Sequence, residues 1–232
     1  GMIDRRRFGT IEELRDKVAA DVTKTIHDAL LERGQALIAL SGGSSPFPIY
    51  EKLSRTNVGW SKVSIIPADD RIVDEDSELS NIAALRRTFG DTGATITPLF
   101  ETSGNEAQAA VEARGIADKL NFPLDLIWLG MGTDGHFASV FPGPDYDTAF
   151  APPAQAKAVR VRPDPLPPEA PVARISLSVP CISNANSIIM VISGKEKSAT
   201  LDQAVEQGEA SGLPIARFIA QLKKNLIVYE GP

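Results

Sequence analysis

The clearest chemical feature of this 232-residue chain is a histidine close to an aspartate in a glycine-rich segment. The chain has only two histidines, and one of them, His136, is separated from Asp134 by a single glycine in the run GMGTDGH. A carboxylate beside an imidazole fixes its tautomer and raises its basicity, as in a general base with an orienting acid. The alternative is a glycine turn that carries a solvated histidine. Because the three glycines directly follow a short apolar run, we favour the general base.

A second segment, SGGSSP, has the composition of an anion-binding loop. Gly42 and Gly43 let the backbone approach a ligand closely, and Ser44 and Ser45 offer hydroxyl groups. A helix that starts at Pro46 offers free N–H groups. The alternative is a tight strand-to-helix turn with a serine cap, and the residues alone do not decide between the two. The segment matches neither the Walker A nor the G-x-G-x-x-G pattern, which argues against a nucleotide.

Charged residues follow two further apolar runs. Asp69, Asp70 and Arg71 form either a surface ion pair or, in a cleft, a group that places Arg71 against an oxyanion. In both cases we expect the two acids to neutralise part of the Arg71 charge. In SGKEK, at the predicted start of a helix, Lys197 is either the counter-charge for a phosphate or a solvated lysine.

The hydrophobic pattern predicts an α/β fold with a largely parallel sheet. Strands are expected at 36–40, 63–66, 124–130, 173–179, 186–193 and 225–229, with one more near 159–161. Helices are expected from Thr10 to Gly34, after Pro46, at 79–89, at 106–120, after Gly194 and at 214–222. Residues 142–171 are expected to be irregular surface chain. In such sheets ligands bind at the carboxyl ends of the strands, where the polar segments above would meet.

The composition limits the class of protein. The net charge is −6 and the basic residues are scattered, so we expect no nucleic-acid partner. A single cysteine, Cys181, forms no internal disulfide, and so few cysteines and histidines argue against zinc. No apolar stretch has membrane-spanning length, and the charged N-terminus does not resemble a signal peptide. We therefore expect a cytoplasmic protein without membrane contact. We interpret Gly1 as an expression scar and expect one domain over residues 2–232.

Taken together, these motifs resemble the 6-phosphogluconolactonases, which belong with the glucosamine-6-phosphate isomerases. The motifs are SGGSSP, DDR with Ser80 and Asn81 about ten residues later, and LGMGTDGHFASVFPG, while GKEK resembles the family's G-x-x-K helix start. They occur in the family's order from near Leu37 to at least Lys197. The resemblance implies a three-layer α/β/α sandwich with a Rossmann-like sheet, no metal, no cofactor and a cytosolic role in the pentose phosphate pathway.

Two positions separate the lactonases from the related deaminases. Deaminases carry Asn-Glu-Pro after the histidine, where this chain has Val140, Phe141 and Pro142. They also typically have Asp-Glu-Tyr where this chain has Asp-Asp-Arg, and an arginine at position 71 is lactonase-like. Lactonases usually have glutamate at position 70, so the role of Asp70 is left open.

The resemblance implies hydrolysis of 6-phospho-D-glucono-1,5-lactone to 6-phospho-D-gluconate. In that reaction His136 activates water, Asp134 orients His136, and Arg71 or backbone N–H groups bind the oxyanion. The expected substrate contacts are Gly42, Gly43, Ser44, Asp69, Gly132, Lys197 and Arg174. Whether Arg174 or Lys195 contacts the phosphate stays open, as does the choice between monomer and homodimer. The alternatives are a deaminase or isomerase on the same scaffold, and a sugar-phosphate sensor without turnover, which would not need the Asp134–His136 pair.

Overall fold

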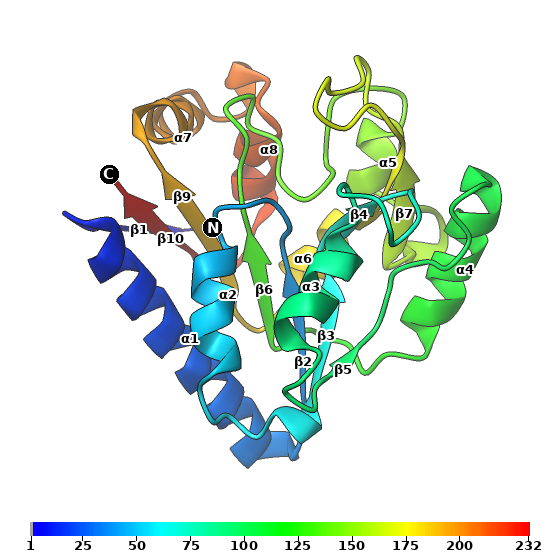
Figure 1. Ribbon diagram of the computed structural model, residues 1–232. Coiled ribbons are helices and arrows are strands. Elements are labelled where there is room, and N and C mark those ends of the chain that lie inside the picture. Colours follow the sequence, from blue (N-terminus) through cyan, green and yellow to red (C-terminus); the bar gives the residue numbers. More distant parts are fainter. Residues whose placement is uncertain (1) are drawn as a thin grey trace.

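The computed structural model describes residues 2–232 and contains a seven-stranded sheet between layers of helices (Figure 1). The strand order is β1-β10-β9-β6-β2-β3-β5, and all neighbouring strands run parallel. The strands are β1 (Ile3–Arg7), β2 (Ala36–Leu40), β3 (Val63–Pro67), β5 (Thr95–Ile96), β6 (Leu126–Leu129), β9 (Ile188–Ser193) and β10 (Leu226–Gly231). The expected parallel α/β sheet is confirmed.

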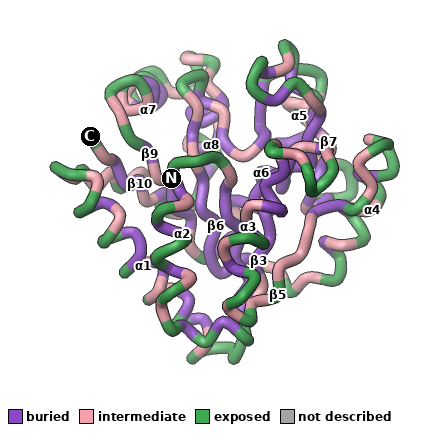
Figure 2. The backbone as a smooth tube through the Cα atoms, viewed as in Figure 1, coloured by how far each residue is buried: buried purple, intermediate pink, exposed green. Residues whose placement is uncertain are grey.

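Helices cover both faces of this sheet, so the expected three layers are also confirmed (Figure 1). One face packs against α1 (Ile11–Arg33), α2 (Phe47–Ser54) and α3 (Asn81–Phe89). The core on the other side includes buried residues of α4 (Glu106–Asp118), α5 (Tyr146–Phe150), α6 (Val179–Ser183), α7 (Lys195–Gln207) and α8 (Pro214–Gln221). Figure 2 shows buried residues along the strands and exposed residues on the outer sides of the helices.

Local signals explain where several helices begin and end. The Thr10 hydroxyl accepts the N–H of Glu13 at 3.1 Å, and Gly34 ends α1 with a φ of 76°. Pro46 caps α2 instead of opening its first turn. The helix expected at 79–89 begins two residues later because the Ser80 hydroxyl accepts the N–H of Ala83. The helix expected at 106–120 ends at Asp118.

A second, three-stranded antiparallel sheet lies beside the first and was only partly predicted. Its order is β4 (Asp69–Arg71), β8 (Arg174–Leu177) and β7 (Ala158–Val161). The strand expected near 159–161 is confirmed as β7. The expectation that the rest of residues 142–171 is irregular surface chain is wrong, because this segment also includes α5. Apolar side chains of both elements, such as Phe150 and Val161, are buried in the core.

The order of strands defines where a ligand fits. After β2 the chain adds β3 and β5 on one side of the sheet, and then returns to add β6, β9 and β10 on the other. The carboxyl ends of β2 and β6 therefore form a topological switch point, the usual ligand site of open α/β sheets.

None of the helices within residues 2–232 has the length and apolar character needed to cross a membrane. One domain over residues 2–232 stays a prediction. It is supported by a core cluster that includes residues of both sheets, among them Ile127 of β6 and Ile175 of β8.

Candidate active site

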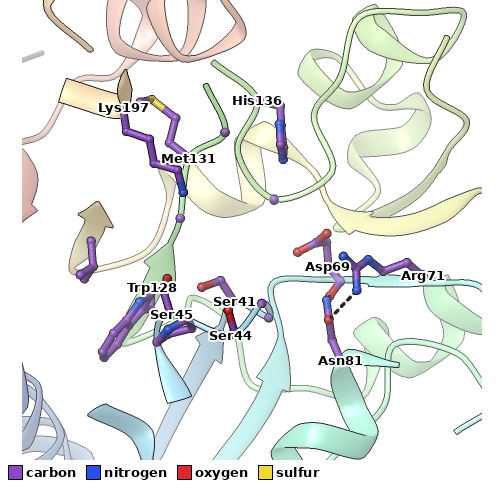
Figure 3. A pocket seen from close by; sticks show the side chains of 17 residues that line it. Ser41, Ser44, Ser45, Asp69, Arg71, Asn81, Trp128, Met131, His136 and Lys197 are labelled. Atoms are coloured by element: carbon purple, nitrogen blue, oxygen red, sulfur yellow. Dashed lines mark hydrogen bonds between the residues drawn. The ribbon is translucent and has the colours of Figure 1, made fainter. Parts of the chain in front are cut away.

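A cavity of about 340 Å³ opens at the carboxyl ends of four neighbouring strands, β9, β6, β2 and β3. Its lining comes from the loops that follow these strands and from the starts of α3 and α7 (Figure 3). The lining residues are Ser41–Pro46, Asp69, Arg71, Asn81, Trp128, Gly130–Gly132, His136, Ala138, Val191 and Lys197. The predicted motifs thus meet at one place.

His136 and Asp134 form a hydrogen-bonded pair in the loop that follows β6. The Nδ1–H of His136 donates to Asp134 Oδ1 at 2.5 Å, and the backbone N–H of His136 donates to the same oxygen at 3.1 Å. Because a carboxylate can only accept, this bond leaves Nε2 of the neutral ring as the free base. Figure 3 shows the imidazole of His136 extending into the cavity. The ring also stacks on the ring of Phe141, with 4.1 Å between the two centroids.

The contact with His136 affects the ionisation of Asp134. Burial disfavours the charged form of Asp134, but the hydrogen bond and the charge of His136 outweigh burial and lower the pKa of Asp134. Asp134 therefore stays a carboxylate near neutral pH, as an orienting acid must.

Two glycines are required because neighbouring side chains occupy the space of a Cβ atom. A Cβ on Gly132 would overlap the His136 imidazole and lie 2.7 Å from Asp134 Oδ1. A Cβ on Gly42 would overlap the side-chain amide of Asn81. Gly43, with a φ of 88°, adopts a left-handed backbone conformation that favours glycine. These glycines let functional side chains approach the backbone closely.

Arg71 reaches the cavity from β4, and its partners differ from those expected. Among residues 2–232 it forms no ion pair with Asp69 or Asp70, so the expected neutralisation is wrong. Its Nη1 instead donates to the carbonyl oxygen of Leu79 at 2.9 Å and to Asn81 Oδ1 at 3.4 Å (Figure 3). These bonds fix the guanidinium at the cavity, where the Asp69 carboxylate is also part of the lining.

Asn81 is a site residue that sequence reasoning noted only as part of a motif. It is buried, lines the cavity, and donates its Nδ2–H to the carbonyl oxygen of Asp69 at 2.9 Å. In the sequence, Asn81 could be noticed only as part of the Ser-Asn pair about ten residues after the two acids. The role of Asn81 depends on the contact between β4 and the start of α3, which the sequence does not show.

Asp70 stabilises the contact between β4 and the start of α3, and it is not part of the cavity lining. Its two oxygens accept the backbone N–H groups of Asn81 and Ile82 at 2.7 and 3.0 Å, which caps α3. Burial nevertheless raises the pKa of Asp70 to about 7. The position left open by the sequence is thus structural: it holds Asn81, and through Asn81 it holds Arg71.

Asp69 lines the cavity, whereas Arg174 does not. Asp69 accepts a hydrogen bond from the hydroxyl of Ser139, whose backbone N–H donates to Ser176 Oγ at 3.2 Å. Arg174 is only 3% exposed and lies 5.0 Å from the centre of the Phe141 ring, and burial lowers its pKa. Its contact with substrate stays a prediction that this geometry does not support.

The opposite side of the cavity is suited to a phosphate. Lys197, in the first turn of α7, lines the cavity across from Arg71, with Ser44 between them (Figure 3). Gly42 and Gly43 belong to the same lining. Within the described chain Lys197 has no ion-pair partner, so its charge is free for an anion. Lys195 is exposed and lies outside the lining.

Comparison with known proteins agrees with this geometry. The family model described as glucosamine-6-phosphate isomerases/6-phosphogluconolactonase matches residues 9–228. A 6-phosphogluconolactonase of Rhizobium meliloti is 31% identical over 97% of both chains, and one of Pseudomonas aeruginosa is 32% identical over 91% of this chain and 89% of the relative. The crystal structure of a 6-phosphogluconolactonase from Shewanella baltica covers 100% of both chains with a TM-score of 0.91 and 29% identity. The chain therefore belongs to the glucosamine-6-phosphate isomerase/6-phosphogluconolactonase family.

Proposed function

We propose that this protein hydrolyses 6-phospho-D-glucono-1,5-lactone to 6-phospho-D-gluconate. The observation that carries the proposal is the cavity with a base, His136, on one side and a free cation, Lys197, on the other. The relatives that are 31–32% identical over most of both chains are named for this activity. A role in the pentose phosphate pathway and a cytoplasmic location stay predictions.

In the proposed mechanism His136 acts first as a base. Its free Nε2 accepts a proton from water while the water oxygen bonds to C1 of the lactone. Asp134 holds the ring in the required tautomer and stabilises the imidazolium that forms. No covalent intermediate with the protein is needed.

The second step opens the ring. The tetrahedral adduct made in the first step carries negative charge on the former carbonyl oxygen, to which Arg71 or backbone N–H groups of the glycine loops donate hydrogen bonds. As the ring opens, this charge returns to re-form the double bond between C1 and that oxygen. When the bond between C1 and the ring oxygen breaks, the imidazolium returns its proton to that oxygen. The sum of both steps is the addition of one water molecule, and the base is regenerated.

The protein would bind the remote end of the substrate through the substrate's phosphate group. Lys197, Ser44 and the backbone of Gly42 and Gly43 are the proposed contacts, and Asp69 and Gly132 are proposed to contact the sugar. Binding energy gained at the phosphate places C1 against His136, so the reacting end need not bind tightly itself.

The lining favours a lactonase over a deaminase. In the described chain Asp69 is the one carboxylate that lines the cavity, and Phe141 stacks behind His136 where a deaminase would have a catalytic glutamate nearby. A sensor without turnover would not need an oriented base.

The test is turnover by the wild-type protein with freshly made 6-phosphogluconolactone. We expect acid release with a kcat/KM above about 10⁴ M⁻¹ s⁻¹, the lower end for dedicated enzymes, after subtraction of spontaneous hydrolysis. Glucosamine 6-phosphate should release no ammonia above background. Ammonia release without lactone hydrolysis would support the deaminase, and tight binding of 6-phosphogluconate without either reaction would support the sensor.

A further inference from the structure

An ion pair between β1 and β10 also contacts α7, the helix that carries Lys197. Glu230, at the end of β10, is only 4% exposed and accepts two hydrogen bonds of 2.7 Å from Nε and Nη2 of Arg5 in the edge strand β1. The remaining Nη1 of Arg5 donates to Asp202 of α7 at 2.6 Å. Arg5 thus joins two strands of the sheet to the helix.

Glu230 also contacts α7 directly, at the residue after Lys197. The hydroxyl of Ser198 donates to Glu230 Oε1 at 3.2 Å. In the same turn the backbone N–H of Gly194 donates to the carbonyl oxygen of Gly231 at 3.4 Å. The first turn of α7 is therefore attached to the end of β10 on both sides of Lys197.

We propose that Arg5, Glu230 and Ser198 are positioning residues for Lys197, and through it for recognition of the substrate's phosphate; this inference rests on the proposed function. Two physical effects support it. The hydrogen bonds fix the direction in which the first turn presents Lys197 to the cavity. Arg5 also neutralises Glu230, which would otherwise oppose an anion at this helix start.

A purely structural interpretation of the ion pair explains less. The Arg5–Asp202 contact involves a carboxylate that is about half exposed, so by itself it contributes little to stability. The backbone ladder along Ile3–Arg7 already joins β1 to β10. It does not account for the bond from Glu230 to Ser198, which attaches the strand to the turn that carries Lys197.

The variant Ser198→Ala removes this attachment and leaves Arg5 and Glu230 in place. We expect KM for 6-phosphogluconolactone to rise on the order of tenfold, because small misplacements of a binding group have effects of this size. The kcat/KM for unphosphorylated gluconolactone should stay within about twofold of wild type. Arg5→Lys, which keeps the charge but cannot contact Glu230 and Asp202 together, should act in the same direction. Lys197→Ala is the reference and should show the largest rise in KM for the phosphorylated lactone.

The matched control is Tyr229→Phe, at the neighbouring position of β10. The Tyr229 hydroxyl donates to Asp21 of α1 at 2.7 Å, so this variant also removes a hydroxyl-to-carboxylate bond between the same strand and a helix. It has no link to Lys197, and we expect wild-type KM for both lactones. Calorimetric titration with 6-phosphogluconate and with gluconate measures the same selectivity without turnover.

The outcomes separate this inference from the proposed function. An unchanged KM in Ser198→Ala, an equal loss on both lactones, or the same selective loss in Tyr229→Phe would overturn the positioning role. If the wild type binds 6-phosphogluconate but hydrolyses no lactone, the proposed function fails, and the calorimetric ratios still decide the inference. If the wild type does not bind 6-phosphogluconate at all, both fail.

Discussion

Replacing His136 with alanine should lower kcat for 6-phosphogluconolactone by about 10²- to 10⁴-fold, the usual contribution of a general base. The reason is geometric. The hydrogen bond to Asp134 occupies Nδ1, which leaves Nε2 as the ring nitrogen that can accept a proton from water in the cavity lined by His136. KM should change much less, because the phosphate contacts lie across the cavity. The rate is measured by acid release from fresh lactone, with spontaneous hydrolysis subtracted.

The chain offers a matched control in its other histidine. His27 is exposed on α1 and lies outside the cavity lining, with its Nε2 3.4 Å from the carbonyl oxygen of Asn57. His27→Ala should keep wild-type kcat. A folded His136→Ala protein that turns over at more than about a tenth of the wild-type rate would remove His136 from the mechanism.

The second large effect is expected for Gly132→Ala. The added methyl group would overlap the imidazole of His136 and crowd Asp134 Oδ1, so the catalytic pair must move. A shift of about 1 Å in a catalytic group costs on the order of 10²-fold in rate, and we expect kcat to fall by at least that factor. Because Gly132 does not have a positive φ, alanine strains the pair and not the backbone.

Gly115→Ala, on the exposed side of α4 and outside the cavity lining, is the control for a glycine-to-alanine change as such. A Cβ at Gly115 meets no atom within 4 Å, so this variant should keep kcat within about threefold and a melting temperature no lower than that of the wild type. Equal kcat for Gly132→Ala and wild type would show that the loop relaxes without cost. That result would contradict the tight geometry described here.

The parts of the fold that were predictable are those that depend on local pattern. The strands β2, β6 and β9 are short apolar runs, and Thr10 and Gly34 delimit α1 by their own hydrogen bonding and backbone conformation. The loops after these strands carry the candidate residues, and a parallel sheet necessarily brings them to one edge. The meeting of His136 and Lys197 at this edge was therefore predictable from the sequence, while their roles and that of Asp134 stay predictions.

The unpredicted parts depend on contacts between distant segments. The strand β4 is three polar residues long, and it exists because it pairs with β8 more than 100 residues later. That pairing places Asp70 beneath α3 and buries Arg174 behind Phe141, which neither spacing nor composition reveals. The charged strand β1 was missed for a similar reason, since its Arg5 is matched by Glu230 at the other end of the chain.

The orientation of the substrate is the central claim, and a crystal structure with bound 6-phosphogluconate tests it most directly. We predict the phosphate among Ser44, the Gly42–Gly43 backbone and Lys197. The C1 carboxylate should lie within hydrogen-bonding distance of His136 Nε2 or the Arg71 guanidinium. A phosphate bound at Arg71, with C1 directed toward Lys197, would contradict the assignment of both ends of the cavity.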